Sequence, residues 1–190
     1  MNERKQLGRL IMERAYKEHS HFKTPTKIVP TYFDFFEISL KHQGVKLAGR
    51  LLHEEIHNLD ICAVGGPGKA IVPVLCRAAF LQEIGVFFIR DSRKKVGGLQ
   101  EPKWLESRIK AGDKVALAAD VVSSGSMVIK AVEEVMQFGA VVVKIVILID
   151  SMEDDGIKRI EQFLRTNMLD IPVRVIFTRK QLLQQENQHG

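Results

Sequence analysis

The residues from Asp120 to Ser126 carry the strongest chemical signal in this sequence. An apolar run, Val115–Ala119, ends at the carboxylate of Asp120, and the small polar loop Ser123-Ser124-Gly125-Ser126 follows shortly after it. In such a loop backbone N–H groups converge on an anion, the start of a helix adds partial positive charge, and serine hydroxyls donate hydrogen bonds. The segment therefore suits a phosphate monoester whose sugar hydroxyls lie near Asp120. A serine N-cap after an ordinary strand explains the same residues equally well.

A basic segment, Arg90-Asp91-Ser92-Arg93-Lys94-Lys95, is the second candidate site. Runs of charge usually lie on solvated surface, and that interpretation stays open. The segment follows an apolar predicted strand, 86–89, and precedes Gly97-Gly98, which also fits a flap that closes over an anion. The net charge of +5 favours anionic partners as a class, without choosing among phosphates, nucleotides and nucleic acid.

The sequence His53-Glu54-Glu55-Ile56-His57 matches the H-E-x-x-H pattern of zinc proteases. On a helix, His53 and His57 would share a face and could bind zinc, with Glu54 as the base. No third ligand stands in a suitable context, and the two histidines flank an apolar stripe of the predicted helix. A zinc protease is therefore the least favoured function that the sequence allows.

The acidic turn Glu153-Asp154-Asp155-Gly156 has two interpretations. Clustered carboxylates can bind a metal ion. Carboxylates at the start of a helix are also stabilised by the helix dipole, and we prefer this second interpretation. The sequence therefore assigns no protein residue as a metal ligand.

Composition narrows the class of protein. Hydrophobic residues make up 45% and charged residues 27% of the chain, which excludes disordered, collagen-like and coiled-coil proteins. No apolar run reaches the ~18 residues of a membrane helix, and no apolar segment like a signal peptide follows residues 1–5. We expect no membrane contact and a cytoplasmic location. Cys62 and Cys76 lie in apolar runs and are expected to be reduced core residues, with a disulfide or active thiols as the alternative.

The elements that must position these groups follow from hydropathy patterning. Apolar runs predict strands at 60–64, 86–89, 114–122, 140–149 and 171–177. Helical patterns fall between them, at 45–59, 70–83, 127–138, 156–166 and from 180 onward. Strands that are apolar throughout are typical of sheets covered on both faces, so we predict an α/β fold with a parallel sheet and helices on both sides. Ligands bind beyond the carboxyl ends of such strands, at the loops 65–69, 90–103, 120–127 and 150–155.

The N-terminal residues do not fit this alternation. Residues 3–19 have a helical pattern, and 20–34 form an extended segment that enters a short strand. The length of 190 residues indicates a single domain. Within it we predict a small hood at about 1–40, a core at about 41–183 and a flexible polar tail at 184–190.

Several segments, in this order and spacing, resemble the type I phosphoribosyltransferases, and among these the orotate branch. They are the N-terminal base-pocket element at 30–34, the pyrophosphate loop at 66–73, the strand that leads into the mobile catalytic loop at 88–98, the motif that binds phosphoribosyl diphosphate (PRPP) at 115–126, the strand end at 147–150 and the C-terminal strand and helix at 177–183. The resemblance implies the type I phosphoribosyltransferase fold.

The resemblance also implies a reaction. A nucleobase nitrogen attacks C1 of PRPP and expels pyrophosphate, with Mg²⁺ as the cofactor that bridges pyrophosphate and ribose oxygens. The residues that it implies are Ser123, Ser124, Gly125 and Ser126 for the 5′-phosphate, Asp120 for the ribose, Arg90, Lys94, Lys69 and Gly68 for the pyrophosphate, and Tyr32 and Phe33 for the base. Lys94 and Asp120 take the catalytic positions. The family's mobile loop reaches a neighbouring subunit, which implies a homodimer, and a nucleic acid partner is not expected.

This chain departs from the family pattern at positions that bear on function. Ala119 replaces the first of two acids, and Ser151 stands where the orotate branch places an arginine for the orotate carboxylate. In the mobile loop, Val96 and Asp91 replace a histidine and a lysine. Two functions follow: an orotate-type phosphoribosyltransferase of pyrimidine nucleotide biosynthesis, favoured by the retained site residues, or a non-catalytic regulatory protein that binds PRPP or a nucleotide on the same fold, favoured by the replacements.

Overall fold

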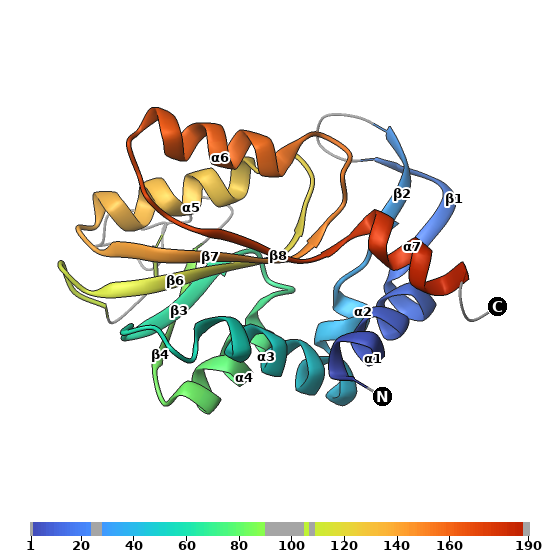
Figure 1. The fold of residues 1–190 in the computed structure, drawn as a ribbon, viewed down its shortest axis with the longest axis horizontal. Coiled ribbons are helices and arrows are strands. Elements are labelled where there is room, and N and C mark those ends of the chain that lie inside the picture. Colours follow the sequence, from blue (N-terminus) through green and yellow to red (C-terminus); the bar gives the residue numbers. More distant parts are fainter. Residues whose placement is uncertain (1, 24–27, 90–104, 107–108, 188–190) are drawn as a thin grey trace, which may run out of the picture.

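The computed structural model describes residues 2–23, 28–89, 105–106 and 109–187. Its centre is a six-stranded sheet with the strand order β5-β4-β3-β6-β7-β8 (Figure 1). The strands are β3 (Ala63–Pro67), β4 (Gly85–Ile89), β5 (Leu105–Glu106), β6 (Lys114–Val122), β7 (Val141–Asp150) and β8 (Val173–Thr178). All neighbours pair in parallel except β5, which pairs antiparallel with β4 at one edge. The predicted parallel α/β sheet is therefore confirmed.

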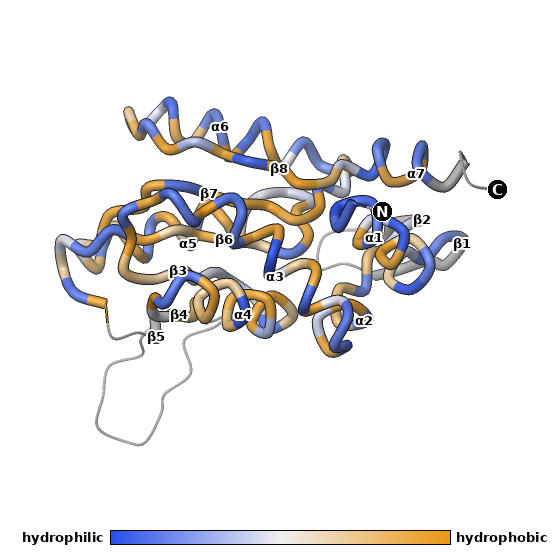
Figure 2. Tube along the Cα trace, turned by 60° about the horizontal axis from the view of Figure 1, so that its bottom comes forward, coloured by the Kyte–Doolittle hydropathy of each residue, from blue (hydrophilic) through white to orange (hydrophobic). Residues whose placement is uncertain are grey.

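Helices cover both faces of the sheet, as predicted. The helices are α3 (His42–Ile56) and α4 (Val72–Gln82) on one face and α5 (Ser126–Gln137) and α6 (Gly156–Thr166) on the other (Figure 1). Alternate residues of β6 enter different cores, since Ala116 and Ala118 pack with α3 and α4 whereas Leu117 and Ala119 pack with α5 and α6. In Figure 2 hydrophobic and hydrophilic residues alternate along the turns of α6, as expected for a helix with one face on the sheet.

The N-terminal hood differs in part from its predicted elements. It consists of α1 (Glu3–Leu10), the π-helical turn η1 (Ile11–Ala15), the antiparallel strands β1 (Tyr16–Lys23) and β2 (Ile28–Phe33), and α2 (Phe36–Ser39). The predicted helix 3–19 is therefore too long. It ends at Ala15 because Tyr16 adopts an extended backbone and pairs with Phe33, with the two rings 5.1 Å apart.

Two further boundaries were wrong for physical reasons. Strand β3 runs through Gly65 and Gly66, which we predicted as loop, because a side chain at these positions would collide with the Phe87 ring and with the Ala118 carbonyl. The C-terminal helix α7 (Arg179–Asn187) extends into the segment 184–190 that was predicted to be a tail. Helix α7 packs beside α1, so the end of the described chain lies on the hood (Figure 1).

Cys62 and Cys76 are both free, as expected, but both are exposed rather than in the core. Cys62 lies just before β3, and Cys76 lies on the outer side of α4. Among the described residues, no helix combines the length and apolar composition that crossing a membrane requires.

Candidate active site

The serine loop, Ser123-Ser124-Gly125-Ser126, connects the end of β6 to the start of α5 and lines the smaller of two cavities. Gly125 is the N-cap of α5 and has a φ of 75°, a left-handed conformation that favours glycine. A Cβ at Gly125 would lie 2.6 Å from the carbonyl oxygen of Gly156, the first residue of α6. The loop is therefore held between two helix starts with no space for a larger residue at its tip.

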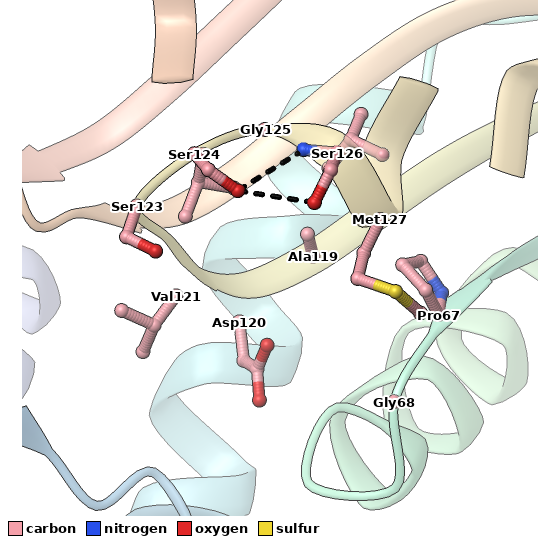
Figure 3. A pocket seen from close by; sticks show the side chains of 12 residues that line it. Pro67, Gly68, Ala119, Asp120, Val121, Ser123, Ser124, Gly125, Ser126 and Met127 are labelled. Carbon is pink, nitrogen blue, oxygen red and sulfur yellow. Dashed lines mark hydrogen bonds between the residues drawn. The ribbon is translucent and has the colours of Figure 1, made fainter. Parts of the chain in front are cut away.

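A cavity of about 140 Å³ lies against this loop. It is lined by the four loop residues, by residues 119–122 of β6 and by Pro67 and Gly68 at the end of β3. The hydroxyls of Ser124 and Ser126 are 3.0 Å apart and hydrogen-bonded to each other (Figure 3). Hydroxyls and backbone amides at the start of a 12-residue helix form a polar pocket suited to an anion.

Asp120 joins this small cavity to a larger one. Figure 3 shows its carboxylate turned away from Ser124 and Ser126, on the side of the site where Gly68 lies. The side chain is half-buried and lines both cavities, as does Ser123. A carboxylate in this position can accept hydrogen bonds from hydroxyl groups of a ligand that extends from one cavity into the other.

The larger cavity has a volume of about 400 Å³ and lies between the hood and the carboxyl edge of the sheet. The hood contributes the aromatic side chains Tyr32, Phe33, Phe35 and Phe36. The sheet contributes polar groups from the loops after β3, β6 and β7. An apolar, aromatic wall opposite a few polar groups is typical of a pocket for a flat heterocycle.

The structure brings most of the predicted site residues together. Tyr32, which is 45% exposed, and Phe33, which is 4% exposed, both line the larger cavity, together with the exposed Lys69. Gly68 lines the smaller one, with a φ of 86° and open space around its α-carbon. The remaining two residues, Arg90 and Lys94, lie outside the described residues.

Burial raises the pKa of the Tyr32 phenol, and the negative charges of Asp34 and Asp120 raise it further. The phenol therefore keeps its proton at neutral pH. Tyr32 and Asp120, which both line the larger cavity, are close enough for their charges to interact.

A polar cluster that the sequence did not reveal closes one wall of the larger cavity. Thr31 Oγ1 donates a hydrogen bond of 2.6 Å to Glu153 Oε1, and Arg179 Nη1 donates to Thr31 Oγ1 at 3.0 Å and to Glu153 Oε1 at 3.3 Å. Thr31 and Glu153 are 122 positions apart, so no local pattern could indicate this contact. The preferred interpretation of the acidic turn holds for Asp155, the N-cap of α6, whereas Glu153 lines the cavity.

The H-E-x-x-H segment does not form a metal centre in the described part of the chain. The rings of His53 and His57 lie 5.8 Å apart, but no group of three or more possible metal ligands occurs among the described residues. Glu55 instead binds Lys144 at 2.9 Å and Arg174 at 3.1 Å. Burial opposes ionisation of Glu55, but these two hydrogen bonds hold its pKa below the ordinary value.

Comparison with known proteins shows that the chain is similar to several phosphoribosyltransferases. An orotate phosphoribosyltransferase of Aquifex aeolicus is 29% identical over 170 residues, 85% of this chain and 91% of the relative. A phosphoribosyltransferase structure from Corynebacterium diphtheriae has a TM-score of 0.75 at 24% identity and covers 96% of this chain and 99% of its own. A Mycobacterium tuberculosis orotate phosphoribosyltransferase in complex with PRPP has a TM-score of 0.74 at 21% identity, with coverages of 95% and 99%. No protein-family model matches the chain.

The fold and the two adjoining cavities define an α/β protein with a small polar pocket beside a larger cavity with an aromatic wall, at the carboxyl edge of its sheet. The similarity extends over nearly the whole described sheet and its hood. The chain has the fold of the type I phosphoribosyltransferases.

Proposed function

We propose that the chain is a phosphoribosyltransferase of the orotate type, which transfers the 5-phosphoribosyl group of PRPP to a nucleobase and releases pyrophosphate. The observation that supports this most directly is the meeting of two cavities at Asp120, one with a serine loop and one with an aromatic wall. The product, a pyrimidine nucleotide, places the reaction in pyrimidine nucleotide biosynthesis. The curated relatives carry the name orotate phosphoribosyltransferase, in line with this assignment.

Each of the two cavities binds a different part of PRPP. The 5′-phosphate binds at the serine loop, where the start of α5 supplies N–H donors. Asp120 accepts hydrogen bonds from the ribose hydroxyls, and Gly68 and Lys69 lie beside the pyrophosphate. The base occupies the larger cavity, next to Tyr32 and Phe33.

Catalysis in this arrangement depends on charge. As the bond from C1 to the pyrophosphate oxygen breaks, positive charge develops on the ribose and negative charge on the leaving group. The half-buried Asp120 carboxylate stabilises the ribose side, and Lys69 neutralises pyrophosphate. Lys94, in the basic segment, also neutralises pyrophosphate, as the family resemblance implies.

Mg²⁺ fits this donor set. The ion is bound in many phosphate sites by one or two carboxylates, with substrate phosphates and water as the other ligands. Asp120 supplies such a carboxylate at the junction of the cavities, and Ala119 supplies none. When bound, Mg²⁺ neutralises charge on the pyrophosphate. We also propose that the protein is a homodimer and lies in the cytoplasm, as expected from the sequence.

The alternative is a non-catalytic protein that binds PRPP or a nucleotide. It is favoured by Ala119, whose methyl group is only 4% exposed and stands where the family places an acid. Both functions use the same serine loop, so only turnover distinguishes them.

The test is pyrophosphate release from PRPP and Mg²⁺ with orotate, uracil and other bases. We expect turnover with at least one base and a tenfold or greater loss of kcat/KM in Asp120→Asn, because charge-assisted hydrogen bonds are lost. Asp113→Asn is the matched control. Asp113 immediately precedes the amino end of β6, whereas Asp120 lies near its carboxyl end, and the Asp113 carboxylate accepts a hydrogen bond from the Lys110 amide. Micromolar PRPP binding without turnover of any base would support the regulatory alternative.

A further inference from the structure

The loop after β7 contains a buried hydroxyl that no group in the described part of the chain satisfies. Ser151 is 5% exposed, lines the larger cavity, and its Oγ has no hydrogen-bond partner among the described residues. A buried hydroxyl without a partner is costly, so it indicates a position where a ligand completes the hydrogen bonding. Ser39 in α2 has a similarly unpaired buried hydroxyl but does not line the cavity.

The charges around Ser151 do not suit an anionic base. Among the described residues, the charged side chains that line the larger cavity are Lys69, Asp120 and Glu153, which together carry one positive and two negative charges. Glu153, 12% exposed, stands on the same loop as Ser151. The neighbouring cation, Arg179, already donates hydrogen bonds to Glu153 and Thr31.

The hydrogen-bonding groups of Ser151 and Glu153 match those on the edge of an uncharged pyrimidine. Glu153 has a second carboxylate oxygen that can accept a hydrogen bond from a ring N–H, and the Ser151 hydroxyl can donate to a ring carbonyl. Uracil presents such an edge, with an N–H between two carbonyl groups. Orotate differs from uracil only by a ring carboxylate, which would enter a cavity whose described lining offers one cation, Lys69, against the carboxylates of Asp120 and Glu153.

We propose that the acceptor is an uncharged pyrimidine of the uracil type, recognised by Ser151 and Glu153, rather than a pyrimidine carboxylate. This rests on the proposed phosphoribosyl transfer. In the step, a bond forms between ring N1 and C1 of the ribose while the bond from C1 to the pyrophosphate oxygen breaks. The leaving pyrophosphate takes that electron pair and accepts the proton released from N1.

The first experiment compares uracil with orotate in the wild-type protein at saturating PRPP and Mg²⁺. Formation of each nucleotide and of pyrophosphate is measured. We expect kcat/KM for uracil to exceed that for orotate by at least tenfold, because the described lining already sets two carboxylates against one cation and disfavours a third carboxylate. Equal or faster reaction of orotate would overturn the inference while leaving phosphoribosyl transfer intact.

A pair of matched variants tests the role of Ser151. Ser151→Ala and Ser39→Ala each remove one unpaired buried hydroxyl, but only Ser151 lines the cavity. We expect Ser151→Ala to lower kcat/KM for uracil about two- to tenfold, the effect of one neutral hydrogen bond, and Ser39→Ala to leave it unchanged. Equal effects in the two variants would contradict recognition by Ser151.

The charge argument is tested by Glu153→Gln, which keeps an acceptor oxygen for Thr31 while removing the negative charge. We expect the ratio of uracil to orotate kcat/KM to fall, and an unchanged ratio would refute the role of this carboxylate. If PRPP binds but no base reacts at all, the proposed transfer itself fails, a result distinct from turnover of orotate alone.

Discussion

The tip of the serine loop offers the sharpest test of how this site is built. Replacing Gly125 by alanine places a Cβ on a backbone with a φ of 75°, which costs roughly 1–2 kcal/mol for an L-residue. The same Cβ would lie 2.6 Å from the Gly156 carbonyl oxygen and 2.9 Å from Ile160 Cγ1. Overpacking of this kind costs about 1–3 kcal/mol, so we expect a total loss of about 2–5 kcal/mol in the free energy of unfolding.

Gly112→Ala is the matched control for this substitution. Gly112 has a φ of 87°, but a Cβ there meets nothing within 4 Å, so only the conformational cost of roughly 1–2 kcal/mol applies. Both variants are compared with the wild type by urea unfolding, and PRPP binding is measured by calorimetry. Gly125→Ala must lose more stability than Gly112→Ala and must bind PRPP more weakly, since the loop has to shift. Equal losses of stability would refute the claim that the loop is wedged against α6.

Three further predictions follow from the same structure. Ala119→Glu restores an acid beside Asp120 and should tighten Mg²⁺-dependent PRPP binding about tenfold by calorimetry; no change would exclude a role for a second acid. Lys94→Ala should remove most of the turnover while circular dichroism and the unfolding midpoint stay unchanged, and an unaltered rate would refute its catalytic role. The pKa of Glu55 is lowered in the folded protein, so its stabilisation is complete above its ordinary pKa of 4.5 and is lost as the pH falls through the lower folded value. Glu55→Gln should therefore flatten the decline of stability below pH 4.5 in acid unfolding, and an identical decline would contradict this.

Local hydropathy patterns were enough to predict the half of the site that one contiguous segment forms. Strand β6 (Lys114–Val122) and helix α6 (Gly156–Thr166) have the bounds that hydropathy predicted. The serine loop lies where it was predicted because a buried strand, a small polar turn and an amphipathic helix each leave a signal within a few residues. The burial of strands on both faces also indicated the parallel sheet before any contact was known.

Pairing over long distances could not be predicted in the same way. The helical pattern continued past Ala15, but Tyr16 joins a strand because it pairs with Phe33, 17 positions further along the chain. Composition alone predicts that Gly65 and Gly66 begin a loop, whereas the neighbouring Phe87 ring and Ala118 carbonyl require glycine within a central strand. In both cases a partner distant in sequence overrides the local preference.

The sequence by itself therefore determined the sheet, the serine loop and the position of Asp120, since these depend on neighbours along the chain. Only the tertiary structure decided which groups line the larger cavity. It brought Thr31 of the hood within 2.6 Å of Glu153, and it left the hydroxyl of Ser151 buried with no partner among the residues that the structure describes. The physical reason is that hydrogen bonding and desolvation act between groups that the fold brings together, whatever their separation along the chain.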